Sequence, residues 1–131
     1  MTLWIVAVLA LYVVQTFLPS TARALSGDPD QHRYIRGPRD APPPLPLVGA
    51  RLERALTNMV EALLVFLPLA LLVEMKGLGD GLAQTGAMVF FFARVAYVPA
   101  YAAGIPLLRS AIWTVGHIGI GMMVWAVWVA L

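Results

Sequence analysis

The sequence contains no cysteine and only two histidines, His32 and His117, among its 131 residues. Without cysteine there is no disulfide, no thiolate metal ligand and no cysteine nucleophile. Two histidines this far apart in the chain also argue against a zinc site, and we expect no bound metal. Any thiol chemistry must therefore be brought to the protein by a ligand.

Charge is also scarce. Only 12% of the residues are charged and 60% are hydrophobic, whereas soluble domains have roughly 25% and 45 to 50%. Nine basic and seven acidic side chains leave a net charge of +2, which gives no indication of nucleic-acid binding. The mean hydropathy of +0.80 excludes a disordered chain and a water-soluble globule, and it indicates a lipid bilayer as the surrounding solvent.

Four apolar stretches are long enough to cross a bilayer core, which takes roughly 20 residues per helix. They run from about Leu3 to Leu18, Leu52 to Val73, Leu82 to Ile105 and Ala111 to Leu131. Together they predict an all-α fold, a four-transmembrane-helix bundle that forms a single domain over residues 1–131. Small residues in the last two stretches, among them Gly104 and Gly119, favour close packing of helices.

Positive charge is unevenly divided between the connecting segments. The loop at about residues 19–51 carries five arginines, whereas the turn between the second and third stretches carries only Lys76. Because positive charge marks the cytoplasmic side, we expect this loop to be cytoplasmic and both chain ends to lie outside. Within the loop, residues 26–29 predict a turn, and the prolines of residues 42–46 predict a non-helical connector.

Two stripes of polar side chains interrupt the second and third stretches. Residues three or four positions apart lie on one face of a helix. The first stripe is Arg51, Arg54, Asn58 and Glu61, and the second is Arg94, Tyr97 and Tyr101. In antiparallel helices, Glu61 lies level with Arg94, which predicts an ion pair. Asn58 with Tyr97 and Arg54 with Tyr101 would then follow toward the cytoplasm.

The arginines outnumber the carboxylates of the stripes. One carboxylate, Glu61, cannot satisfy Arg51, Arg54 and Arg94 together. Guanidinium groups without partners, next to tyrosine hydroxyls and the amide of Asn58, are typical of a receptor for a small zwitterionic anion. The alternative interpretation is that the facing stripes only hold the two helices together.

The turn at residues 104–110 brings Arg109 and Ser110 to the same membrane face. Together with a helix N-terminus, Arg109 would lower the pKa of a bound thiol from its usual value of about 8.5. We expect Ser110 to cap the last helix, with a catalytic role as the alternative. His117 is expected to be buried and bonded to a neighbouring helix, with a role as proton carrier as the alternative.

Several segments together resemble the MAPEG family, the membrane-associated proteins of eicosanoid and glutathione metabolism, and especially its small bacterial members. The segment Arg51–Glu61 is similar to the family pattern R-A-x-x-N-x-x-E. Gly37-Pro38-Arg39-Asp40 is similar to the loop that precedes this helix in bacterial members. Residues 94–101 and 108–110 follow the family pattern on the third helix and at the start of the fourth.

The resemblance implies a homotrimer in a bacterial inner membrane, with glutathione as co-substrate held between subunits near the cytoplasmic face. Arg109 would stabilise the glutathione thiolate for attack on a lipophilic electrophile that arrives from the bilayer, and Ser110 would be the second catalytic residue. The implied activity is that of a glutathione-dependent transferase or peroxidase. The implied glutathione-binding residues are Arg51, Arg54, Asn58, Glu61, Arg94, Tyr97 and Tyr101.

Two positions depart from patterns of other MAPEG members. Ala62 stands where some eukaryotic members have tyrosine, and Tyr97 stands where the prostaglandin synthase branch has histidine. Two other functions stay open: a MAPEG-fold binding protein without catalysis, and a small proton-coupled exporter with Glu61 as carrier. The arginine stripe counts against the exporter, and we expect no nucleic-acid partner.

Overall fold

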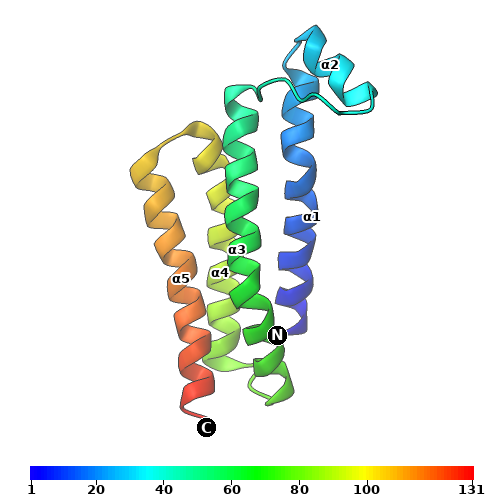
Figure 1. Cartoon of the computed structure of the whole chain (residues 1–131). Helices are drawn as coiled ribbons and strands as arrows, with labels where there is room; N and C mark the ends of the chain where they lie inside the picture. Colours follow the sequence, from blue (N-terminus) through cyan, green and yellow to red (C-terminus); the bar gives the residue numbers. More distant parts are fainter.

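A computed structural model describes all 131 residues as five α-helices and no strands (Figure 1). Four of the helices are long and apolar enough to cross a membrane. This confirms the predicted all-α fold with four membrane spans. The helices are α1 (Thr2–Leu25), α2 (Pro29–Arg36), α3 (Leu47–Met75), α4 (Gly81–Ala103) and α5 (Pro106–Trp128).

The four long helices lie side by side, with α3 and α4 between α1 and α5 (Figure 1). Helix α1 packs on α3 and α4, and α5 packs mainly on α4, so that α1 and α5 do not touch. Both chain ends lie at one end of the bundle, with the α3–α4 turn. Helix α2 and the α4–α5 turn lie at the opposite end, where the two polar stripes begin.

The spans differ from the predicted stretches mainly at their ends. Helix α1 continues past Pro19 to Leu25, and α3 begins at Leu47, directly after Pro46. Helix α5 begins at Pro106, because the fixed φ of proline suits the first turn of a helix. Hydropathy marks only the part of each helix that crosses the bilayer core, whereas the helices continue into the interface. The connector between α1 and α3 is correspondingly shorter than predicted.

This connector contains α2, a helix that the sequence reasoning did not predict. The predicted turn at residues 26–29 is present, and it forms the start of α2. The Asp28 carboxylate accepts a hydrogen bond from the Asp30 amide at 2.9 Å, and Pro29 occupies the first turn. An acidic N-cap followed by proline is a strong start signal even for a polar helix. The proline segment 42–46 is non-helical, as expected.

A buried polar contact fixes the connector against α1. Gln31 on α2 is only 2% exposed. Its amide nitrogen donates to the Pro44 carbonyl at 2.7 Å, and its carbonyl oxygen accepts from Arg23 of α1. Arg23 also donates to the Pro43 carbonyl at 3.0 Å. These bonds hold the proline segment and α2 together at the end of α1.

The core lies between the helices and contains small residues where α4 and α5 meet. Phe66 of α3 and Phe90 of α4 stack with ring centroids 4.4 Å apart. Gly86 and Gly119 allow the backbones of α4 and α5 to touch, because a Cβ on either would lie 2.5 Å from the carbonyl oxygen of the other. The close packing predicted for the last two spans is thus present, with Gly119 as one of its partners.

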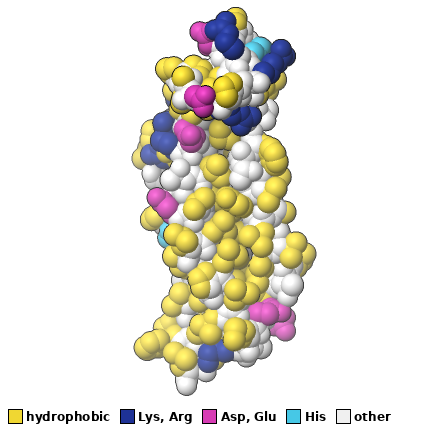
Figure 2. Space-filling view, turned by 45° about the vertical axis from the view of Figure 1, so that its right-hand side comes forward, with side chains coloured by type: hydrophobic (Ala, Val, Ile, Leu, Met, Phe, Trp, Pro, Cys, Tyr) yellow, Lys and Arg dark blue, Asp and Glu magenta, His cyan; other side chains and the backbone are white.

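The outer surface of the bundle is apolar over most of its length. Figure 2 shows a broad hydrophobic region between two ends at which charged side chains gather. Among the large apolar side chains, Phe17, Leu64 and Phe92 are more than half exposed. Large apolar side chains facing outward on spans of this length are expected for lipid-facing helices. The chain is therefore an integral, multi-pass membrane protein.

Candidate functional site

The two predicted stripes face each other across α3 and α4, next to the first turns of α5. The Arg54 guanidinium carbon lies 6.0 Å from the centroid of the Tyr101 ring, and the Arg109 guanidinium carbon lies 4.9 Å from it. The rings of Tyr97 and Tyr101 meet edge to face at 5.4 Å. The Arg94 guanidinium carbon of α4 lies 5.5 Å from the centroid of the Tyr97 ring, so arginines from three helices lie around the pair of tyrosines.

Arg94 is the buried centre of this cluster, with 2% of its surface exposed. Its Nη1 donates to the Asn58 side-chain oxygen at 2.6 Å. Its Nε and Nη2 are buried without any hydrogen-bond partner in the protein. Because a buried donor without a partner is costly, the guanidinium is incompletely satisfied within the chain.

The predicted ion pair between Glu61 and Arg94 does not form. Glu61 is exposed, and its carboxylate accepts from the Asn58 amide at a long 3.5 Å. Asn58 therefore lies between the two charges and bonds to both of them. The prediction compared only backbone heights in the bundle, at which Glu61 and Arg94 are level. The long Arg94 side chain instead extends to Asn58, one turn away from Glu61 on α3.

A cleft of about 420 Å³, called the upper cleft below, opens beside the tyrosines. Its volume is within the range of small-molecule sites, roughly 300 to 1,000 Å³. Residues from α3, α4 and α5 line it, and they include both predicted catalytic residues. The lining residues are Asn58, Tyr97, Tyr101, Arg109, Ser110, Trp113 and Thr114.

A smaller cleft of about 160 Å³, called the lower cleft, lies deeper in the bundle. It shares Asn58 and Trp113 with the upper cleft, so the two clefts adjoin. Charged and polar side chains meet apolar ones in its wall. The lining residues are Asn58, Glu61, Ala62, Val65, Arg94, Trp113, His117 and Ile120.

Two of the predicted binding residues lie outside both clefts. Arg51 donates from Nη1 to the Ala102 carbonyl at 2.9 Å, at the end of α4. Its guanidinium packs so closely on Gly104 that a Cβ there would lie 2.4 Å from Cζ. Arg54 is exposed and reaches the cluster only through the Tyr101 ring. In this structure Arg51 therefore supports the α4–α5 turn.

Ser110 is not the cap of α5, contrary to the prediction. Helix α5 begins one turn earlier, at Pro106, and the residue before it is Ile105. Ser110 is therefore inside the helix and exposed, where it lines the upper cleft. Its carbonyl accepts from the Thr114 hydroxyl at 3.0 Å. Arg109 lies in the first turns of α5, near the positive end of the helix dipole.

The sequence reasoning did not include Trp113, Thr114 or His117 in the site. Arg109, Trp113 and His117 are four positions apart, and this spacing places them on one face of α5. The prediction that His117 bonds to a neighbouring helix is wrong. Its Nδ1 lies 2.9 Å from the Trp113 carbonyl of its own helix. The four-residue spacing from Arg109 was the sequence signal that could have identified Trp113 and His117 as site residues.

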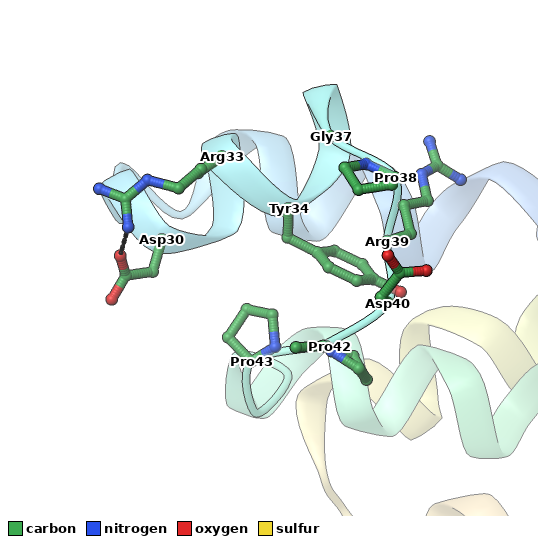
Figure 3. A pocket seen from close by; sticks show the side chains of 10 residues that line it. Asp30, Arg33, Tyr34, Gly37, Pro38, Arg39, Asp40, Pro42 and Pro43 are labelled. Atoms are coloured by element: carbon green, nitrogen blue, oxygen red, sulfur yellow. Dashed lines mark hydrogen bonds and ion pairs between the residues drawn. The ribbon is translucent and has the colours of Figure 1, made fainter.

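A separate hollow of about 490 Å³ lies between α2 and the proline segment (Figure 3). The Tyr34 ring lies between them, and Arg39 and Asp40 lie on the far side of the hollow from the Arg33–Asp30 ion pair. The charged side chains around it are exposed. Because no buried side chain without a partner is found there, this hollow lacks the feature that marks the cluster around Arg94.

The comparisons with known proteins agree with this geometry at the level of the family. A model of the MAPEG family matches residues 1–129. No match was found among curated proteins, and none among solved structures. The family match covers all four spans and both clefts. No group of three or more histidine, aspartate or glutamate side chains is placed to hold a metal ion.

Proposed function

Because the chain belongs to the MAPEG family, we propose that it is a membrane-bound, glutathione-dependent transferase or peroxidase acting on lipophilic electrophiles. The observation that carries the proposal is the buried Arg94, which has two N–H donors without a partner and lines the lower cleft, next to the upper cleft of about 420 Å³. Guanidinium groups bind carboxylates well, because two parallel N–H groups match two oxygens. Glutathione supplies two carboxylates, one ammonium group and the thiol that the chain lacks.

The charges of the cluster suit this tripeptide. Arg94 and Arg109 approach the clefts from α4 and α5, and Arg54 lies at the rim above Tyr101. The exposed Glu61 carboxylate is available for the ammonium group. Asn58, Tyr97 and Tyr101 add hydrogen-bond donors and acceptors between these charges. In this proposal Arg51 acts indirectly, since it holds the turn from which α5 and Arg109 begin.

Arg109 is placed to stabilise the thiolate. Its guanidinium lines the upper cleft, and the first turn of α5 adds the partial positive charge of a helix N-terminus. Both effects favour the charged form of a thiol and lower its pKa. Sulfur then attacks the electrophile, which enters from the lipid, and the leaving group or oxygen anion takes up a proton. Ser110 lies beside Arg109 in the same cleft and can donate a hydrogen bond there.

Assembly and orientation follow from the same groups. Glu61 is exposed on a membrane span in the single chain, and a charge at that depth costs about 2.5 to 3.5 kcal/mol on insertion scales. A neighbouring subunit of a homotrimer that covers this face, with glutathione between the subunits, removes the cost. We further propose that the arginine-rich connector lies in the cytoplasm of a bacterial cell and both chain ends lie on the outer side of the inner membrane, because positive charge marks the cytoplasmic side.

The test is to replace Arg109 with alanine and to measure glutathione binding and conjugation of a chromogenic electrophile. We expect glutathione binding to persist. Turnover near neutral pH should fall about tenfold for each unit by which the pKa of the bound thiol rises. Arg36→Ala, on the exposed face of α2, is the matched control and should behave as the unmodified protein. Unchanged turnover in Arg109→Ala would refute its role. Glutathione binding without turnover in the unmodified protein would indicate a binding protein.

A further inference from the structure

His117 lines the lower cleft, together with Glu61 from α3 and Arg94 from α4. The imidazole is partly buried, and its ring lies 3.7 Å from that of Trp113, centroid to centroid. Its only hydrogen bond is the 2.9 Å contact between Nδ1 and the Trp113 carbonyl, within its own helix. No hydrogen bond links this side chain to a neighbouring helix.

The Trp113 contact decides which ring nitrogen is basic. A carbonyl oxygen can only accept a hydrogen bond, so Nδ1 carries the hydrogen when the ring is neutral. Nε2 then keeps its lone pair and makes no hydrogen bond within the protein. Nε2 is therefore the free, basic nitrogen of a side chain that lines the lower cleft. Imidazole is also the side chain that exchanges protons most readily near neutral pH.

The lower cleft is suited to hold water between His117 and the upper cleft. Its volume is about 160 Å³, whereas one water occupies about 30 Å³ in the liquid. Its polar lining includes Asn58, Glu61 and Arg94. Asn58 and Trp113 border both clefts, so water in the lower cleft would lie next to the upper cleft.

We propose that His117 accepts, through water in the lower cleft, the proton that the glutathione thiol loses in the upper cleft. This inference rests on the function proposed above. The S–H bond breaks, its electron pair stays on sulfur, and an N–H bond forms at Nε2. Later in the cycle the imidazolium returns the proton to the product anion or to bulk water. His117 does not touch the thiol. It acts only through water, as the group that receives the proton.

The other groups at the clefts are less suited to accept this proton. Arg109 is always protonated and cannot accept it. Glu61 is assigned to the ammonium group of glutathione, and its negative charge also offsets the repulsion between Arg94 and an imidazolium at His117. Tyr97, on α4 above the lower cleft, is a proton donor near neutral pH and not a base.

The test compares the unmodified protein with His117→Asn in detergent. The asparagine amide can still donate to the Trp113 carbonyl, so the variant removes the base and keeps the structural bond. Thiolate formation is followed by its ultraviolet absorbance, and protons released to a weakly buffered solution are counted at the same time. His32→Asn is the matched control, because His32 is the other histidine of the chain and lies on α2.

The unmodified protein and His32→Asn should release fewer protons than the number of thiolates formed, because His117 retains part of them. His117→Asn should release one proton for each thiolate. Equal release from all three proteins would overturn the proposal for His117 while leaving glutathione binding intact. If glutathione neither binds nor forms a thiolate in any of them, the proposed function itself fails, and the role of His117 fails with it.

A second measurement uses the unmodified protein alone, in case His117→Asn does not fold. Calorimetric titration with glutathione in buffers of different ionisation enthalpy gives the number of protons released. We expect fewer than one proton to be released for each thiolate formed, because His117 retains part of them. A value of one proton per thiolate at every pH would contradict the proposal.

Discussion

Arg94 donates to Asn58 at 2.6 Å, and no carboxylate lies within ion-pair distance of its guanidinium. A buried positive charge is thus held by a neutral amide. Two of its N–H groups have no partner in the protein. The arrangement is intelligible if a negatively charged ligand completes it, because a buried cation without such a partner would only destabilise the fold.

The first prediction concerns the two partners of this bond. Asn58→Leu leaves the Arg94 charge buried without its acceptor, so we expect a loss of stability of about 3 to 5 kcal/mol. Arg94→Met removes the charge together with its need for a partner, and we expect it to cost only about 1 kcal/mol. The double variant should be more stable than Asn58→Leu alone. Unfolding in mixed micelles measures these differences, and a greater loss in Arg94→Met than in Asn58→Leu would contradict the prediction.

The second prediction separates folding from binding at Glu61. Because Glu61 is exposed and has only a long contact with Asn58, Glu61→Gln should change stability by less than about 1 kcal/mol. It should weaken glutathione binding by roughly 10- to 100-fold, as is typical when a hydrogen bond to a charged group is lost. The affinity can be measured by calorimetric titration.

The control for Glu61 is Glu53→Gln, which lies on the same helix and is also exposed. It should leave both stability and affinity unchanged. If Glu61→Gln binds glutathione as tightly as Glu53→Gln does, the ammonium group is recognised elsewhere.

The third prediction concerns the contact between α4 and α5, which positions the residues of α5. A Cβ at Gly119 would lie 2.5 Å from the Gly86 carbonyl oxygen, whereas a Cβ at Gly121 would meet no atom within 4 Å. Gly119→Ala should therefore destabilise the protein by about 1 to 3 kcal/mol and reduce turnover. Gly121→Ala should be neutral or slightly stabilising. Thermal unfolding of the two variants tests this prediction. An equal change in Tm in both would show that α4 and α5 can move apart at Gly119 without loss of stability.

The spans could be predicted from the sequence because four apolar runs have the length that a bilayer requires. Helix α2 was not predicted, because eight residues with three charged side chains are too few and too polar to give a hydropathy signal. Its start was nevertheless signalled by Asp28 before Pro29, and its end by Arg33 and Arg36 in the last turn before Gly37. These local signals are visible in the sequence once hydropathy is set aside.

Sequence spacing identified the face of each helix more reliably than it identified individual bonds. The spacing of the stripes paired Arg54 with Tyr101, which lie close together, and it paired Asn58 with Tyr97, which line the same cleft. It could not show that the Arg94 side chain extends to Asn58 instead of Glu61, because backbone levels do not fix the direction of a long side chain. Ser110 was misplaced for a related reason, since Pro106 begins α5 one turn earlier than the apolar run suggested.

The most direct test of the central claim is thermal unfolding of the purified protein with increasing concentrations of glutathione. A ligand at one hundred times its dissociation constant stabilises the folded state by about 2.7 kcal/mol. We expect a rise in Tm that saturates with glutathione in the unmodified protein and is strongly reduced in Arg94→Met. If millimolar glutathione leaves the Tm of the unmodified protein unchanged, the cluster around Arg94 is not a glutathione site.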